Sequence, residues 1–498
     1  MEPVALWRRA RAAMLLAVAV TLFASCTVSK NPITGNKRAY GYTWAQEVQI
    51  GKEADPQIVA QFGLYEDADL TSYVERIGEK VLAESHLRRP DTDPEFRNTP
   101  FTFRVLDSPV VNAFALPGGY VYVTRGLLTH LDNEAQLAVV LGHEVGHVAA
   151  RHASKRAATQ QLGQLGLIGG AILGQQVLGG SAGQNILDLG GTAAQLLFLS
   201  YGRDDERESD DLGVEYAAKA GYKASEAAEF FRSLKRISDE SGQSIPSFLS
   251  THPDPGEREQ KIPRLAQEWA PLQPDEVGQQ DFMSRLEGTV LGENPRQGFT
   301  RGGVFYHPDL RFRFPVPNGY QVINQPTQVA MIEPNQQAIL VLQLAQGARS
   351  ARDAAAELTG QQGITIVESG NTTVSGYPAY AVVGDAQTQQ GVIRFLSYYI
   401  EYGGLVYNFL GYAARDNFAS YNGAFLQAVR GFSQLTDRSI LNIEPHRVRI
   451  VAASRTAPFR EFVPANLPEQ FTAEELAILN QVTLDEVIQR GQPLKLPN

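Results

Sequence analysis

The pentapeptide His143-Glu144-Val145-Gly146-His147 constrains the fold of this 498-residue chain more than any other feature. On a helix, two histidines four residues apart lie on one face, so both can bind the same metal ion. Glu144 would then lie beside a water molecule activated by that metal and act as its general base. The pattern predicts one Zn²⁺ per chain, bound by His143 and His147, and hydrolysis of peptide bonds.

The residues before the motif predict that it lies on a buried helix. The apolar run 137–141 leads directly into the motif, and Asp132 and Asn133 are candidates for the N-cap of the helix. The alternative is a pair of hydrogen-bonded core histidines with a surface glutamate between them. We favour the metal site because burying three polar side chains without a ligand costs free energy.

A catalytic zinc site needs a third protein ligand and a position left free for water. His152 follows His147 by five residues and would face away from it on a continuing helix, so we do not expect it to bind the metal. The acidic segment 203–211 is a better source, although it is also compatible with a solvated, charged start of a helix. The pairs that its spacing allows are Glu206 with Asp210 and Asp204 with Glu208.

The residues on either side of the motif predict an α+β fold that is mainly helical, with a small β-sheet beside the active-site helix. Thr43 and Gln46 form a capping-box pattern that begins a helix ending near residue 61. Apolar residues spaced three and four apart predict a second helix over 70–82. Two β-rich segments, 110–115 and 120–124, flank a Pro-Gly-Gly turn and predict a hairpin.

A strand beside a metal-binding helix can receive an extended peptide as an additional strand. Asn112 and Ala113 lie in the predicted hairpin and are therefore candidates for binding the substrate backbone. A purely structural role for Asn112 beside the turn is equally compatible with its position.

The N-terminus predicts export. Basic residues, the apolar stretch 14–23 and small residues before Cys26 form a signal peptide over residues 1–25. The stretch is too short for a permanent membrane helix, which needs about 20 residues. Cys26 is the only cysteine in the chain and stands where bacterial lipoproteins carry their lipid. We expect a lipid-anchored tether over residues 26–42 at the outer membrane, with plain secretion as the alternative.

The charge of the chain argues against nucleic-acid binding. The formal net charge of the whole chain is −10. The signal peptide carries a net charge of +2, from Glu2, Arg8, Arg9 and Arg11, so the chain without it has a net charge of −12. An acidic protein without basic runs is a poor nucleic-acid binder. We therefore expect no nucleic-acid partner, and membrane contact only through the lipid anchor.

Several motifs in a fixed order make a family resemblance specific. They are Asn31-Pro32-Ile33-Thr34-Gly35, Val111 to Gly119, Leu141 to His152, Glu206-Arg207-Glu208-Ser209-Asp210 with Gly213, and Thr251-His252-Pro253. This order resembles the HtpX- and Oma-like zinc metallopeptidases, gluzincins related to the CAAX prenyl proteases, and within them the exported periplasmic branch. Gly202 and Ser209 depart from the Ser and Ala usual in the family, and neither position is a ligand.

The resemblance implies roles for the remaining site residues. Glu206 would be the third zinc ligand, and Asp210 would accept a hydrogen bond from a ligand histidine. His252 would be a gate or a transition-state stabiliser, with a structural loop histidine as the alternative. The implied function is cleavage of unfolded or misassembled cell-envelope proteins in quality control. The rival is a chaperone or assembly factor with a gated, rarely active site.

The C-terminal half carries no metal or nucleophile pattern. After a zinc-peptidase domain over 43–270 we expect a linker over 271–300 and an α+β accessory domain over 301–440. Helices near 351–361 and 417–433 would cover one face of its antiparallel sheet. Within the peptidase domain, the Gly-rich stretch 162–191 predicts either a flap over the cleft or a helical hairpin.

The last residues, 441–498, resemble a degenerate LysM module, the small peptidoglycan-binding fold. The resemblance rests on a first strand at 447–451 and on the closing segment 491–497, whereas Ser454-Arg455-Thr456 replaces the usual Gly-Asp-Thr turn. It implies peptidoglycan as an additional partner.

Overall fold

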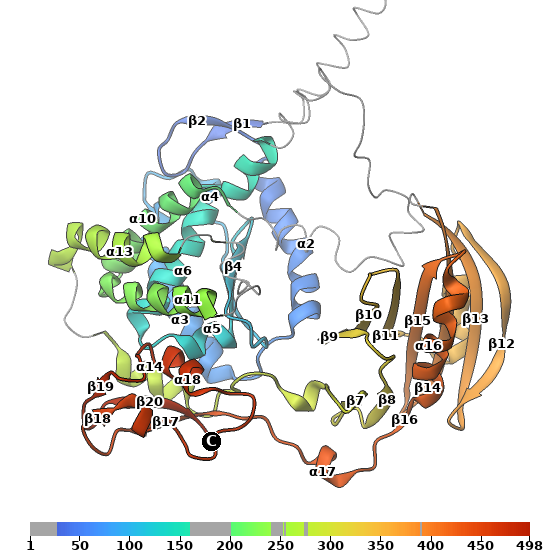
Figure 1. Ribbon diagram of the computed structural model, residues 1–498. Coiled ribbons are helices and arrows are strands. Elements are labelled where there is room, and N and C mark those ends of the chain that lie inside the picture. The colour runs from blue at the N-terminus through green and yellow to red at the C-terminus, as the bar shows by residue number, and fades with distance from the viewer. Residues whose placement is uncertain (1–26, 160–200, 241–251, 253–254, 273–276, 389–390) are drawn as a thin grey trace, which may run out of the picture.

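The computed structural model in Figure 1 describes residues 27–159, 201–240, 252, 255–272, 277–388 and 391–498. The predicted signal peptide, Cys26 and the Gly-rich stretch 162–191 lie outside the described residues. Within the described ranges, no helix combines the length and apolar character needed to cross a membrane. A mainly helical body carries the His-Glu-x-x-His motif, and a large antiparallel sheet lies to its right in Figure 1.

The helical body surrounds a sheet of three strands in the order β3-β5-β4, in which β3 is parallel and β4 antiparallel to β5. The strands are β3 (Thr102–Leu106), β4 (Ala113–Leu116) and β5 (Tyr120–Thr124). The main helices are α2 (Trp44–Phe62), α3 (Ala68–Ala83), α6 (Glu134–Ala149), α10 (Arg203–Lys219), α11 (Ala227–Glu240) and α13 (Pro255–Glu268). Shorter elements are β1 (Thr27–Lys30), β2 (Lys37–Tyr40), α4 (Pro94–Arg97) and α5 (Arg125–His130).

The structure contains the elements that the local sequence signals predict. Thr43 and Gln46 make the expected capping box at the start of α2. The predicted hairpin is the antiparallel pair β4–β5, and its turn contains Gly118 and Gly119 with φ of 82° and 99°. Glycine is the residue that adopts such backbone angles without strain. The expected α+β class, with both helix and sheet, is therefore confirmed.

The C-terminal residues pack into the helical body. Strands β17 (Val448–Ala452) and β20 (Pro493–Pro497) pair antiparallel, and α18 (Ala473–Leu479) packs against β20. The buried side chains of these elements belong to the same hydrophobic core as those of α3 and α6. Helix α14 (Gln279–Leu286), inside the expected linker, joins that core as well. The segment 441–498 and α14 therefore share a core with the helical body, whereas the antiparallel region between them has cores of its own. The expected domain boundaries and peptidoglycan binding by 441–498 stay predictions.

Residues 299–434 form the antiparallel region. Its larger sheet has the order β12-β13-β14-β15-β11-β10-β9, and a smaller one the order β16-β8-β7-β6. The larger sheet comprises β9 (Gln321–Gln325), β10 (Gln328–Ile332), β11 (Ala338–Leu344), β12 (Ile364–Val374), β13 (Tyr377–Thr388), β14 (Gly391–Tyr402) and β15 (Leu405–Ala414). The smaller sheet comprises β6 (Phe299–Arg301), β7 (Val304–His307), β8 (Phe312–Pro315) and β16 (Ser433–Gln434).

Two helices cover opposite faces of the larger sheet, so the expectation that they share one face is wrong. Helix α15 (Ala351–Thr359) packs against Phe395 and Tyr399 of β14. Helix α16 (Phe418–Gly431) packs against Leu396 and Ile400 of the same strand. Because successive side chains on a strand point to opposite faces, the two helices lie on opposite sides of the sheet.

Candidate metal centre

Helix α6 presents the motif inside the protein. Asn133 caps the helix, with its side chain accepting a hydrogen bond from the Gln136 N–H. His143, Glu144 and His147 are only 3%, 1% and 2% exposed. A helix buried on all sides must find partners for its polar side chains within the protein. Helix α10 and His252 supply them for the two motif histidines.

Two glycines allow α10 to approach α6 closely. A Cβ atom added at Gly142 would lie 2.8 Å from the carbonyl oxygen of Gly213, and one added at Gly213 would lie 2.7 Å from the backbone nitrogen of His143. Any side chain at either position would therefore push the helices apart. The contact holds the acidic start of α10 against the two motif histidines.

Donor atoms of His143, His147, Glu206 and His252 converge, all within 4.8 Å of one another. His143 Nε2 and His147 Nε2 are 2.9 Å apart, and the Glu206 carboxylate oxygens lie 3.6 and 3.5 Å from them respectively. His252 Nδ1 lies 3.3 Å from His143 Nε2 and 3.1 Å from Glu206 Oε1. The four donors come from α6, from α10 and from a position just before α13.

These separations fit a metal ion. Zinc lies about 2.0–2.1 Å from histidine nitrogen, so two ligands of a tetrahedral zinc are separated by roughly 3.3 Å. Burial lowers the pKa of His143 and of His147 well below the ordinary value, so both imidazoles are neutral. A neutral imidazole has the lone pair that metal binding needs. The donor set therefore suits zinc.

The structure distinguishes the two pairs that the spacing of the acidic segment allows. Glu206 and Asp210, one turn apart on α10, are each 3% exposed and face α6. Asp204 points away, with 94% of its side chain exposed. Glu208 lies 3.3 Å from His152 Nε2. Only the pair Glu206 and Asp210 is placed beside the motif histidines.

His152 does not face away from His147, which corrects the helical projection. Helix α6 ends at Ala149, and Arg151 has a φ of 59°, which turns the chain back. His152 Nδ1 consequently lies 2.9 Å from His147 Nδ1. It orients His147 from the side opposite Nε2 and is not among the converging donors.

Glu144 lies beside the donors and is not one of them. Both carboxylate oxygens are buried without a hydrogen-bond partner among the described residues. Burial raises the pKa of Glu144, while the neighbouring His252 opposes that shift. His252 Nε2 is 3.5 Å from Glu144 Oε1. This single histidine therefore contacts both the donor set and the glutamate predicted to be the base.

A second group of residues holds the donors in place. Asp210 Oδ1 lies 3.0 Å from His143 Nδ1, the nitrogen that faces away from the other donors. Burial raises the pKa of Asp210 to about 8. Arg258 of α13, 2% exposed, donates to Glu206 Oε2, and its Nε lies 3.3 Å from Asp210 Oδ1. Sequence reasoning missed Arg258, whose only signal is that it follows the Thr-His-Pro motif by a few residues.

Tyr201 is another residue that sequence reasoning missed. Its ring stacks on that of His147 with centroids 4.0 Å apart and an interplanar angle of 23°. It stands just before α10 and gave no recognisable motif. The stacking fixes the plane of the His147 imidazole.

Asn112 and Ala113 lie at the edge of the small sheet. The Asn112 N–H donates to Thr124 Oγ1 at 3.1 Å, and its carbonyl accepts from the Thr124 N–H at 3.0 Å, so its backbone is already used. Its side-chain Oδ1 is buried and has no partner among the described residues. Ala113 begins β4, which pairs only with β5 in the described sheet. The outer edge of β4 and the Asn112 amide remain the candidates for contact with a peptide.

Residues 69–266 match Peptidase family M48. These residues form an M48 peptidase domain. The M48 domain contains every converging donor, and its match confirms the resemblance to the Oma-like and HtpX-like metallopeptidases.

Three curated relatives each match between 43% and 48% of this chain. The beta-barrel assembly-enhancing protease of Yersinia pestis is 32% identical over 219 residues, covering 43% of this chain and 42% of that protein. The protein of the same name from Escherichia coli K12 is 28% identical, covering 46% and 45%. The mitochondrial metalloendopeptidase OMA1 of Schizosaccharomyces pombe is 27% identical, covering 48% and 66%. The chain thus spans less than half the length of the two bacterial relatives.

Proposed function

We propose that this protein is a zinc-dependent metalloendopeptidase. The observation that carries the proposal is the convergence of His143, His147 and Glu206 within the M48 domain, with the buried Glu144 beside them. These three residues would hold the ion. When bound, zinc supplies Lewis-acid polarisation of the scissile carbonyl and of a water molecule. Arg258 and Asp210 would keep Glu206 and His143 oriented for that role.

Glu144 acts as the general base and then as the general acid. Its buried carboxylate takes a proton from the attacking water and delivers it to the nitrogen of the leaving amine. Burial strengthens it as a base by raising its pKa. The edge of β4 would hold the substrate in an extended form by backbone hydrogen bonds. Pairing with an edge strand through backbone groups accepts unfolded chains whatever their sequence.

We place this activity in the bacterial cell envelope, on unfolded or misassembled envelope proteins. Support comes from the predicted signal peptide, from Cys26 as a lipid-attachment site at the outer membrane, and from the names of the two bacterial relatives. Quality control of envelope proteins would follow from such a location and such a substrate class.

A second candidate function is a chaperone or assembly factor whose peptidase site is usually closed. His252 favours it, because its Nδ1 stands within 3.3 Å of His143 Nε2 and within 3.1 Å of Glu206 Oε1. A catalytic zinc needs three protein ligands and an open position for water, and a fourth protein ligand closes that position. Movement of His252 would then switch the protein between binding and cutting.

Cleavage of an unfolded test protein, with the zinc content measured in the same sample, tests the leading proposal. We expect Glu144→Gln to abolish cleavage while zinc remains bound, because the change removes the base and no proposed ligand. Zinc-loaded wild-type protein that cuts no unfolded substrate would refute the peptidase as the resting function. Faster cleavage by His252→Ala than by wild type would then favour the closed-site alternative.

A further inference from the structure

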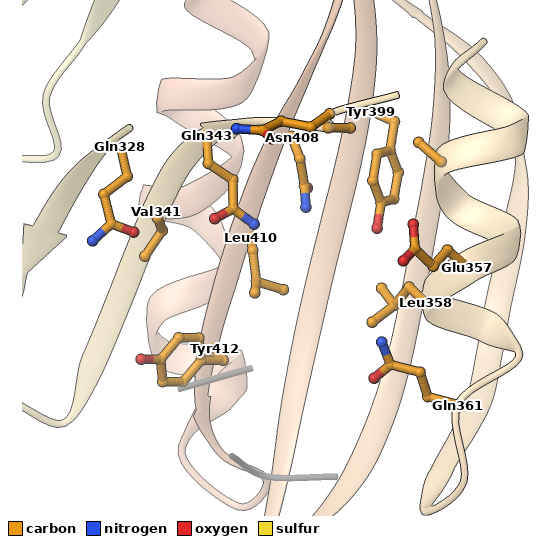
Figure 2. A pocket seen from close by; sticks show the side chains of 13 residues that line it. Gln328, Val341, Gln343, Glu357, Leu358, Gln361, Tyr399, Asn408, Leu410 and Tyr412 are labelled. Atoms are coloured by element: carbon orange, nitrogen blue, oxygen red, sulfur yellow. The ribbon is translucent and has the colours of Figure 1, made fainter. Parts of the chain in front are cut away.

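A cavity of about 240 Å³ lies in the antiparallel region, on the face of the larger sheet that carries α15. Helix α15 packs mainly against β12, β13 and β14 on that face, and the cavity lies beside it over β15, β11 and β10. Figure 2 shows the helix closing one flank of the cavity and the strands forming its floor. The cavity belongs to a different hydrophobic core from that of the M48 domain.

Polar side chains cross the floor of the cavity in one row. Gln328 of β10 is paired in register with Gln343 of β11, Gln343 with Asn408 of β15, and Asn408 with Tyr399 of β14. Directly paired residues on neighbouring strands project from the same face, about 4.8 Å apart. Three amides and a phenol therefore form a continuous hydrogen-bonding row across four strands. A sheet face meant only for packing would be apolar here.

Several polar atoms in the cavity are available to a ligand. Asn408 Oδ1 accepts a hydrogen bond from Ser397 at 2.8 Å, and its amide nitrogen points into the cavity in Figure 2. Gln361, from the residues just after α15, has a buried Oε1 without a hydrogen-bond partner among the described residues. A buried acceptor without a partner costs free energy unless something binds it.

The lining also indicates the charge of the ligand. Among the described residues that line the cavity there is no lysine, arginine or histidine, and the one charged group is the carboxylate of Glu357. An anionic ligand would meet no counter-charge and one repulsive group. Side chains of Leu410, Leu358 and Tyr412 add apolar and aromatic surface between the amides. The site suits a small neutral molecule with many hydroxyl groups and some apolar faces.

We propose that this cavity binds a short neutral saccharide of one or two sugar rings. Each sugar hydroxyl is both donor and acceptor, and so is each side-chain amide of the row. The aromatic surfaces of Tyr399 and Tyr412 offer packing for the C–H face of a sugar ring. The volume is below the range of about 300–1,000 Å³ typical of sites for larger ligands.

An extended peptide is a poorer match for the same place. Peptides that join a sheet pair with the backbone of an edge strand. Strands β10, β11, β15 and β14 are all interior strands of the larger sheet, so their backbone groups already pair on both sides. Recognition here must come from side chains alone, and this favours hydroxyl groups over a peptide backbone.

Calorimetric titration of the purified protein with cellobiose, maltose and N,N′-diacetylchitobiose, beside a neutral tetrapeptide, tests the proposal. We expect saturable binding of at least one disaccharide and no binding of the tetrapeptide. Gln343→Leu should weaken that binding roughly tenfold, because it removes an amide hydrogen bond from the floor. Gln321→Leu, on the same sheet but outside the cavity, is the matched control and should bind as wild type does.

Three outcomes would overturn the proposal: no disaccharide binds at millimolar concentration, only the tetrapeptide binds, or Gln343→Leu binds as wild type does. Gln361→Leu provides a second variant if Gln343→Leu proves unfolded in a thermal melt. Because binding is measured without peptidase activity, the result does not depend on the proposed metal centre.

Discussion

Lys495 connects the C-terminal strand β20 to the start of the motif helix, and its removal should destabilise the M48 domain. Its side chain is fully buried. The ammonium group donates to the carbonyls of Thr129 and Leu131, both at 2.9 Å, and pairs with Asp132 Oδ1 at 2.7 Å. Asp132 immediately precedes Asn133, the N-cap of α6. A residue near the C-terminus thus fixes the entry to the helix that carries His143.

The magnitude follows from what Lys495→Met would leave behind. Removing one partner of a buried ion pair costs about 3–5 kcal/mol, because the other charge stays buried without compensation. The side chain of Asp132 retains 19% exposure, so water partly restores its solvation. The two carbonyls lose their donor as well. We therefore expect the free energy of unfolding to fall by about 3 kcal/mol, the lower end of that range.

Urea unfolding followed by tryptophan fluorescence measures this effect, because Trp44 is buried in the core that contains the M48 helices and Trp269 packs against the same core. Lys30→Met is the matched control, since Lys30 and Asp93 form an exposed pair 3.3 Å apart with side chains 57% and 43% exposed. Such surface pairs contribute at most about 1 kcal/mol. Lys495→Met should shift the midpoint clearly, and Lys30→Met very little.

The same experiment separates a shared core from an independent C-terminal module. If residues 441–498 folded alone, Lys495→Met would leave the Trp44 transition unchanged and unfold only the module. An unchanged Trp44 midpoint would therefore refute the reasoning. A single transition at lower urea concentration would show that the two parts unfold together.

Three further perturbations test the site and its surroundings. Gly213→Ala should separate α10 from α6, because its Cβ would lie 2.7 Å from the backbone of His143. We expect a lower zinc content and a loss of about 1–3 kcal/mol in the free energy of unfolding. Full zinc occupancy, measured by atomic absorption, would contradict this prediction. Arg258→Met should weaken zinc binding roughly 10- to 100-fold in a chelator competition, because Glu206 loses its buried partner. An unchanged zinc affinity would show that Arg258 does not support the site. Burial lowers the pKa of His130 from 6.5 to about 4, so the unfolded state takes up a proton first as the pH drops. The free energy of unfolding should therefore fall between pH 6.5 and pH 4, and the urea midpoint should fall less steeply for His130→Gln. Equal slopes for the two proteins would show that His130 does not cause the pH dependence.

The parts of the structure that the sequence predicts well depend on neighbouring residues. The Thr43 capping box, the Pro-Gly-Gly hairpin and the capped, buried motif helix each follow from local geometry and periodicity. The placement of Glu206 required more than spacing, because the alternative pair Asp204 and Glu208 has the same separation. The family resemblance pointed to Glu206, and the structure places Glu206 and not Asp204 beside His143.

The features that the sequence does not predict depend on contacts between distant segments. Arg258 reaches Glu206 from a different helix, 52 residues along the chain. Whether an arginine on an amphipathic helix points to solvent or to a buried carboxylate depends on how the helices pack. The polar row of the cavity cannot be predicted from the sequence for the same reason. Gln328, Gln343 and Asn408 become neighbours only through the register of the strands.

His152 shows how one local event can reverse a periodicity argument. The projection that turned it away from His147 assumes an unbroken helix, with about 100° of rotation per residue. The helix instead ends at Ala149, and Arg151 adopts a left-handed conformation that no preceding glycine or proline announces. Arg151 is held in place by long-range contacts, since its guanidinium donates to Glu47 of α2 and to the Tyr42 carbonyl. The local break in α6 is therefore fixed by tertiary structure, and the orientation of His147 in the metal centre depends on it.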